Sequence, residues 1–226
     1  MKIHQFLAYI FLLFTFSSFA QPSATSSSDV LKSLEQKKAL HETSLVKNVP
    51  FKNIGPSIMS GRVVDIDVNP DNPTEFYVGY ASGGVWHTVN NGTTFEPILD
   101  SSDTQNVGDI AVDWKNRVIW VGTGENNSSR SSYAGIGILK SSDNGKTWDN
   151  LGLNDSHHIG RILINPNNPD EVVVGSTGHL YSPNKERGIY KTTDGGQTWS
   201  QKLFVDDMSG IIDLAHSPNN FNIMFA

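Results

Sequence analysis

The chain has 226 residues, of which 37% are hydrophobic, 10% aromatic and 18% charged, and its formal net charge is −6. This composition supports a packed globular domain and is too polar for a membrane protein. The acidic balance argues against nucleic acid or anionic lipid as a partner, and the absence of cysteine excludes disulfides and thiolate zinc sites.

The first twenty residues have the pattern of a secretory signal peptide. Lys2 supplies the positive start, residues 6–16 are almost wholly apolar, and Ser18-Phe19-Ala20 offers small residues for cleavage. An N-terminal anchor helix is the alternative. We therefore expect a secreted, periplasmic or cell-surface protein, with no membrane insertion after cleavage.

Residues 21–50 are expected to precede the main domain. The segment 21–28 is rich in serine and predicts disorder. After Asp29, apolar residues recur at helical spacing, which predicts a short amphipathic helix from Asp29 to about His41 that docks onto the domain.

The rest of the chain, 51–226, predicts short strands in a repeated order. Three units each contain an inner strand, a turn, a second strand and a third strand, at 62–68, 76–80 and 84–88, then 109–113, 118–123 and 137–141, then 161–165, 172–176 and 188–192. A fourth unit begins with a strand at 211–214, and the sequence stops inside its expected second strand. The segment Phe51–Ile54 resembles the strands that follow each unit and is expected to be an outermost strand.

Each complete unit leads into a similar octet. Ser141 to Trp148 reads SSDNGKTW, Thr192 to Trp199 reads TTDGGQTW, and Thr88 to Phe95 is a weaker copy, TVNNGTTF. Counted between their last residues, the copies lie 148 − 95 = 53 and 199 − 148 = 51 residues apart. A period near fifty residues, built of short strands, predicts the blades of a β-propeller rather than a helical solenoid.

We interpret each octet as the tip of a β-hairpin. The Ser or Thr ends one strand, the Asp carboxylate accepts turn N–H groups, the Gly takes a positive φ, and the aromatic ring is expected to lie back over its own hairpin. The residues given this structural role are Thr88, Asn90, Gly92, Phe95, Ser141, Asp143, Gly145, Trp148, Thr192, Asp194, Gly196 and Trp199.

The octets resemble the Asp-box of BNR repeats, S-x-D-x-G-x-T-W, found in sialidases, xyloglucanase-type glycoside hydrolases and the sortilin family of receptors. The resemblance covers about Phe51 to Ala226, with Ser60-Gly61-Arg62 and Gly83-Gly84-Val85-Trp86 as further specific points. It implies an all-β propeller of four-stranded antiparallel blades, and it places the box Asp in a structural role.

Three blades and part of a fourth do not close a ring, which usually needs at least four. We therefore expect an incomplete propeller, the N-terminal piece of a longer protein. Its further blades would then be partners within the same polypeptide.

Propellers bind ligands at the mouth of the central channel or in loops on one face. The long polar loops 124–135 and 178–187 are the candidates, and the alternative is that they are insertions without a function. Arg62 and Arg161 begin inner strands, where they either face the channel or form ion pairs between blades. The candidate ligand-binding residues are Arg62, Asp109, Glu125, Arg130, Tyr133, Arg161 and Tyr181.

No metal or cofactor is expected. His157-His158 could suggest a metal site, but adjacent strand residues point to opposite faces and no carboxylate lies at a supporting spacing. Nucleophile elbows, phosphate loops and the His-Glu-x-x-His motif are absent from the sequence.

The enzymatic relatives are matched only in part. In xyloglucanase-type enzymes a catalytic Asp precedes the first-blade Gly-Gly, where this sequence has Ser82 or a gap; the Arg-Ile-Pro motif of sialidases does not occur. We expect a non-enzymatic exported propeller that binds a peptide or glycan. The alternative is a glycoside hydrolase whose second carboxylate lies beyond this chain.

Overall fold

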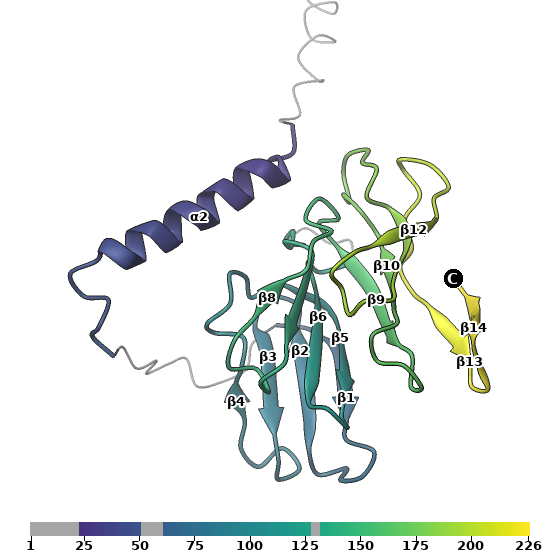
Figure 1. Ribbon diagram of the computed structural model, residues 1–226, viewed down its shortest axis with the longest axis horizontal. Helices are drawn as coiled ribbons and strands as arrows, with labels where there is room; N and C mark the ends of the chain where they lie inside the picture. Colours follow the sequence, from purple (N-terminus) through teal and green to yellow (C-terminus); the bar gives the residue numbers. More distant parts are fainter. Residues whose placement is uncertain (1–22, 51–60, 128–131) are drawn as a thin grey trace, which may run out of the picture.

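The computed structural model describes residues 23–50, 61–127 and 132–226. These residues form an all-β assembly preceded by a helix (Figure 1). The predicted signal peptide, the predicted outer strand Phe51–Ile54 and the candidate Arg130 lie outside the described residues.

Three four-stranded antiparallel sheets follow one another along the chain, and each keeps its strands in sequence order from the inner to the outer edge. The strands of blade one are β1 (Val63–Val68), β2 (Phe76–Tyr80), β3 (Gly84–Thr88) and β4 (Glu96–Pro97); those of blade two are β5 (Val107–Asp113), β6 (Val118–Thr123), β7 (Ile138–Ser141) and β8 (Asp149–Asn150); those of blade three are β9 (Ile159–Ile164), β10 (Val172–Ser176), β11 (Gly188–Thr192) and β12 (Ser200–Leu203). The inner strand β5 lies between β1 and β9. The predicted incomplete propeller of four-stranded blades is confirmed.

The fourth sheet is a two-stranded hairpin of β13 (Ala215–Ser217) and β14 (Asn220–Phe225). The predicted strand at 211–214 is wrong, since strand pairing begins only at Ala215. Ile211 instead donates its N–H to the carbonyl of Ser176 at 2.9 Å and accepts a bond from the Thr177 hydroxyl at 3.1 Å. This stretch is therefore bonded to blade three rather than to a strand of its own sheet.

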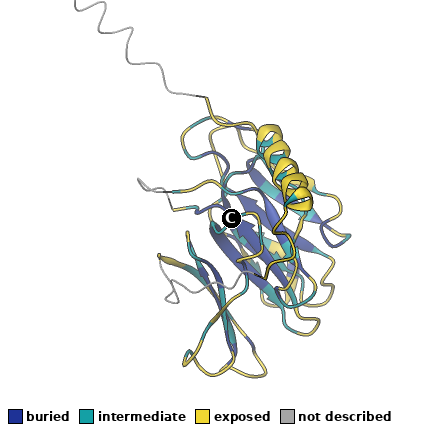
Figure 2. Ribbon diagram, turned by 90° about the vertical axis from the view of Figure 1, so that its left-hand side faces the viewer, coloured by how far each residue is buried: buried dark blue, intermediate teal, exposed yellow. Residues whose placement is uncertain are grey.

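The hydrophobic core lies between the blades. Because side chains alternate across a strand, Ile110 packs toward blade one while its neighbour Ala111 packs toward blade three. Trp120, fully buried on β6, likewise lies in the core shared with blade three. Figure 2 shows the buried strands in dark blue, in contrast to the exposed helix. Among the described residues, blade two packs against blades one and three, and blade three packs against blade two and the hairpin β13–β14 (Ala215–Phe225).

The helix α2 spans Ser27–Thr43 and lies at the upper left of Figure 1. It begins inside the segment predicted to be disordered, because the Ser26 side chain caps it by accepting the N–H of Asp29 at 3.2 Å. No helix residue is fully buried, but Val30 and Leu34 pack against the core between blades one and two. Among the described helices, none has the length and apolar character that crossing a membrane requires.

The octet hairpins share one set of hydrogen bonds. In the second hairpin, Asp143 Oδ1 accepts the N–H of Lys146 at 3.0 Å and of Thr147 at 2.9 Å, and Ser141 Oγ accepts the N–H of Gly145 at 2.8 Å. Gly145 has φ +86°. In the third hairpin Asp194 accepts the N–H of Thr198, and the Thr192 hydroxyl accepts the N–H of Gly196. In the first hairpin the amide oxygen of Asn90 accepts the N–H of Thr94, and the Thr88 hydroxyl accepts the N–H of Gly92. These bonds are local, which is why the octet alone specifies the turn.

The tryptophan of each full octet joins its blade to the preceding one. Trp148 Nε1 donates to the carbonyl of Ile98 in blade one at 2.9 Å, and Trp199 Nε1 donates to the carbonyl of Leu151 in blade two at 2.7 Å. The prediction that the ring lies over its own hairpin is therefore wrong for these two tryptophans. It holds for the first octet, where the Phe95 ring lies against Gly92, 3.5 Å from the position of a Cβ there. The hairpin tip approaches the neighbour because Gly145 has no side chain; a Cβ there would lie 2.8 Å from Ile98 Cβ.

Candidate functional site

Charged side chains from successive inner strands meet at Arg161. Asp65, Asp109 and Arg161 occupy the same strand position, because each pairs with the corresponding glycine of its second strand, Gly79, Gly122 or Gly175. Arg161 Nη1 lies 2.9 Å from Asp109 Oδ1 and 3.6 Å from Asp65 Oδ1, and Arg161 Nε donates to Asp213 Oδ1 at 2.8 Å. The inner edge of the blades therefore carries three carboxylates around one guanidinium.

Two of these carboxylates also bind the next inner strand. Asp65 Oδ2 accepts the N–H of Ile110 at 3.4 Å, and Asp109 Oδ2 accepts the N–H of Ile162 at 2.6 Å. Only 2% of the Asp109 side chain is exposed, and burial is the main reason why its pKa is raised well above the usual value; the Asp65 carboxylate adds to this and Arg161 opposes it. Asp109 thus links adjacent inner strands and is closed to a ligand.

Arg62 and Glu125 form a second ion pair. Arg62 donates to Glu125 Oε1 through Nε at 2.7 Å and through Nη2. The carboxylate is buried at the start of the loop 124–135, where the Glu125 N–H is bonded to the carbonyl of Tyr133 at 3.2 Å. The structure therefore brings Arg62 together with Glu125 and Arg161 together with Asp109, in the blade-to-blade ion pairs that were the alternative to a ligand-binding role.

A cavity of about 460 Å³ opens beside the two long loops. Tyr181 lines it and is 60% exposed, while Tyr133, 51% exposed, lies between two lining residues, Ser132 and Ala134. The lining consists of Ser23, Ala24, Ser132, Ala134, His157, His158, His179, Leu180, Tyr181, Ser182 and Pro183. Parts of both candidate loops therefore contribute to one concave surface.

Three histidines lie at this cavity. His157 and His158 come just before β9, and the ring of His157 stacks on that of His179 with centroids 3.6 Å apart. Burial, followed in smaller part by neighbouring groups that include His179, lowers the pKa of both His157 and His158 to about 4, so both imidazoles are neutral at pH 7.

His179 is held between two polar side chains. Its Nε2 lies 3.3 Å from Asp155 Oδ1, and its Nδ1 lies 2.9 Å from Ser182 Oγ. The sequence argument about His157-His158 assumed a strand and no nearby carboxylate. Both premises are wrong, because the two histidines precede the strand and the Asp155 side chain reaches the group.

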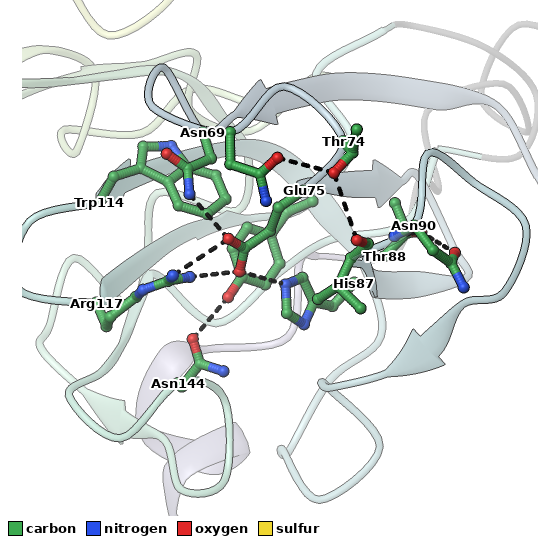
Figure 3. A network of polar contacts seen from close by, with 12 residues as sticks. Asn69, Thr74, Glu75, His87, Thr88, Asn90, Trp114, Arg117 and Asn144 are labelled. Carbon is green, nitrogen blue, oxygen red and sulfur yellow. Dashed lines mark hydrogen bonds and ion pairs between the residues drawn. The ribbon is translucent and has the colours of Figure 1, made fainter.

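A second polar network surrounds Glu75 between blades one and two (Figure 3). The Glu75 carboxylate accepts a bond from Asn69 Nδ2 at 2.8 Å, lies 3.1 Å from His87 Nε2 and receives both terminal nitrogens of Arg117. The hydrogen bonds from Arg117, with smaller contributions from Asn69 and His87, outweigh desolvation and lower the pKa of Glu75 to about 2. The carboxylate is therefore ionised at every physiological pH.

Blade three contains the counterpart of this network. Asn165 Nδ2 donates to Glu171 Oε2 at 2.6 Å, and Lys191 takes the place of His87 as the strand partner that forms an ion pair with the carboxylate. A cluster that recurs in a second blade with a different basic partner fits a scaffold role. We therefore do not place the functional site at Glu75.

Sequence reasoning missed Asp65 and Asp213, which lie with Asp109 around Arg161. At the cavity it missed Asp155, His179 and Ser182, and it named His157 and His158 only to reject them as a metal site. The repeat period could have revealed Asp213, because it follows Arg161 by 52 residues, the same spacing that separates Arg161 from Asp109. No periodic signal marks the cavity group, since its residues belong to loops of different length.

Comparisons with known proteins bear on the fold. No protein-family model and no curated protein sequence matches the chain. Among solved structures, an ancestral GH74 enzyme is similar with a TM-score of 0.54 at 22% identity, covering 70% of this chain and 21% of that one. The GH74 enzyme of Niastella koreensis has a TM-score of 0.48 at 20% identity, and the match covers 61% of this chain and 22% of that one. YCF48 bound to D1 peptide has a TM-score of 0.49 at 16% identity, and the match covers 75% of this chain and 51% of that one. The chain thus spans about a fifth of the length of these GH74 structures, and the first likeness supports the fold alone.

Proposed function

We propose that this chain is an exported β-propeller module that binds a peptide or glycan in the cavity lined by Tyr181. The observation that carries the proposal is the convergence, in one concave surface, of an exposed tyrosine with buried polar groups from two loops. Ligand sites combine an apolar or aromatic wall with a few placed polar groups, and loops on a rigid scaffold commonly supply both.

Each part of this surface suits a polar chain-like ligand. Tyr181 presents a large ring with a hydroxyl that can contact sugar or peptide groups at low entropic cost. His158 lies in the wall of the cavity and is 4% exposed, and its Nδ1 has no hydrogen-bond partner among the described residues. The signal-peptide pattern of the first twenty residues supports export.

A glycoside hydrolase is the second candidate. Its support is the fold likeness to a GH74 enzyme and the raised pKa of Asp109, because the general acid of a glycosidase is a carboxyl group with a raised pKa. It is the weaker candidate, since Asp109 is buried and bonded to both Arg161 and the Ile162 N–H.

The test compares the full chain with Tyr181→Ala against soluble polysaccharides, xyloglucan among them, and against a library of peptides. We expect saturable binding of one ligand class that Tyr181→Ala weakens by at least about tenfold, a free-energy change of about 1.4 kcal/mol. Phe225→Ala removes another exposed aromatic ring, on β14, and is the matched control that keeps the affinity.

Two results would overturn the binding-module proposal. One is equal affinity of the full chain and the Tyr181→Ala variant for every ligand that binds. The other is release of sugar from a polysaccharide that Asp109→Asn abolishes, which would favour the hydrolase.

A further inference from the structure

The loops before β9 and between β10 and β11 bring together an Asp-His-His group, Asp155, His157 and His179. One potential ligand atom from each side chain lies within 4.8 Å of the other two. Asp155 and His157 precede β9, whereas His179 follows β10, so the group forms only when the two loops meet. Two imidazoles and one carboxylate, without cysteine, form a ligand set that suits Zn²⁺.

The spacing suits tetrahedral coordination. Ligand atoms about 2.0 to 2.1 Å from a tetrahedral zinc ion are separated from one another by about 3.3 to 3.4 Å. His179 Nε2 and Asp155 Oδ1 are already 3.3 Å apart. The ring of His157 stacks on that of His179, with an angle of 21° between the planes, so coordination by both requires His157 to rotate about its side-chain bonds.

Neighbouring groups orient these ligands. Ser182 Oγ lies 2.9 Å from His179 Nδ1, which leaves Nε2 facing Asp155. The backbone of Asp155 is held at both ends, because Asn184 Nδ2 donates to its carbonyl at 2.8 Å and its N–H donates to Glu186 Oε2 at 2.8 Å. Metal-binding histidines characteristically have such a partner on the second ring nitrogen.

A second, independent observation comes from buried polar atoms around the group. Asn154 Oδ1, Ser156 Oγ and His158 Nδ1 are buried and have no hydrogen-bond partner among the described residues. All three belong to the loop that supplies Asp155 and His157, and His158 also lines the cavity. Because buried polar atoms are nearly always hydrogen bonded, these three atoms need partners that the described residues do not supply, and ordered water or a bound ligand beside the group would supply them.

We propose that Asp155, His157 and His179 bind a Zn²⁺ ion, with the remaining coordination position directed into the cavity lined by Tyr181. The ion links the loop before β9 to the loop between β10 and β11. It gives the cavity a positive centre that can accept an oxygen or nitrogen atom of a ligand. Binding of the ion does not depend on the peptide or glycan proposed above.

The experiment uses the full chain without an affinity tag, freed of metal by a chelator and titrated with Zn²⁺ in a calorimeter. We expect one Zn²⁺ per chain and a melting temperature that rises with Zn²⁺ concentration, because the ion binds the folded state. His179→Gln and Asp155→Asn abolish the one-to-one binding. Ser182→Ala, which removes only the partner of Nδ1, weakens binding by about 10- to 100-fold.

Two controls keep the readout specific. His41→Gln removes an exposed histidine of α2 and leaves Zn²⁺ binding unchanged. Tyr181→Ala also leaves Zn²⁺ binding unchanged, so this inference and the binding-module proposal fail separately. Co²⁺ replaces Zn²⁺ in a spectroscopic assay, where His₂Asp coordination gives visible absorption bands that His179→Gln removes. The inference is overturned if the full chain binds no Zn²⁺, or if the binding survives both His179→Gln and Asp155→Asn.

Discussion

Glu75 shows how one carboxylate secures the contact between two blades. It accepts bonds from Asn69 and His87 within blade one and from Arg117 in blade two (Figure 3). Only 8% of its side chain is exposed, so loss of the charge leaves donors without an acceptor in a partly buried region. Because Glu171 has a similar arrangement in blade three, substitutions of Glu75 and Glu171 can be compared directly.

Glu75→Gln is expected to lower the free energy of unfolding by about 1.5 to 3 kcal/mol at pH 7, the range for hydrogen bonds to a charged group. The pKa of Glu75 is about 2 in the folded state against 4.5 for the free group. Its contribution is therefore complete above pH 4.5 and is lost as the pH falls toward 2. Denaturant unfolding of both proteins at pH 7 and near pH 2 measures the difference.

Glu171→Gln is the comparison for this measurement. The carboxylate has a single basic partner, Lys191, and we expect a smaller loss of stability at pH 7. A difference between the full chain and Glu75→Gln that stays constant from pH 7 to pH 2 would contradict the assigned ion pairs.

The octet hairpins are elements whose geometry depends on a few side-chain oxygens. Asp143 accepts hydrogen bonds from two backbone N–H groups and from the Thr147 hydroxyl. These bonds lower the pKa of Asp143 to about 2, and the bond from the Thr147 hydroxyl contributes most. In the first hairpin Asn90 accepts the equivalent N–H of Thr94 at 2.9 Å through an amide oxygen. An oxygen acceptor matters more here than the negative charge.

We therefore expect Asp143→Ala to destabilise the chain more than Asp143→Asn does, because only the alanine removes the acceptor. Melting temperatures of the two variants measure this order. Neither variant should change ligand affinity, since the hairpin 141–148 contributes no residue to the cavity. Equal melting temperatures for the two variants would show that the turn does not depend on this acceptor.

Trp148 connects its hairpin to the preceding blade through its ring and its Nε1 bond to Ile98. Trp148→Ala is expected to cost about 3 to 5 kcal/mol, because it opens a cavity between blades one and two. Trp148→Phe, the residue type found in the first octet, keeps most of the packing and loses only the hydrogen bond, so its cost should be clearly smaller. Urea unfolding curves decide between this and a surface role, for which both changes would be nearly neutral.

The molecule as a whole depends on how closely adjacent inner strands approach. The second strand of each blade has a glycine at the same position, and the next blade lies directly against it. A Cβ on Gly79 would meet Val107 Cγ1 at 3.2 Å, one on Gly175 would meet Ile211 Cγ2 at 2.9 Å, and one on Gly122 would meet Ile159 Cγ2 at 2.4 Å. Closer contact leaves less room for an added methyl group.

We expect the loss of stability to increase in the order Gly79→Ala, Gly175→Ala, Gly122→Ala. For Gly122→Ala the cost should be about 1 to 3 kcal/mol, the usual range for an overpacked core. Chemical denaturation of the three variants measures the series. An order unrelated to these distances would mean that the spacing between blades is not set at these glycines.

The sequence by itself determined the repeat and the shape of its parts. The period near fifty residues, the strand alternation and the octet turns depend on residues within a few positions of one another, because strand pairing with short turns and hydrogen bonds such as Asp143 to Thr147 are local. The extra residues of α2 and the shifted start of β13 lie at element ends, where a single cap or contact with a neighbour decides the boundary.

Only the tertiary structure decided which side chains of one repeat contact which residues of the next. The carbonyl that receives the Trp148 N–H lies 50 residues away, Arg161 meets Asp109 across 52 residues, and His179 meets Asp155 across 24. These contacts depend on the twist and separation of packed blades, and at the cavity on the length of two loops, none of which a local pattern encodes. The sequence therefore identified Tyr181 as a candidate, while the group of Asp155, His157 and His179 beside it became visible only when the loops were folded together.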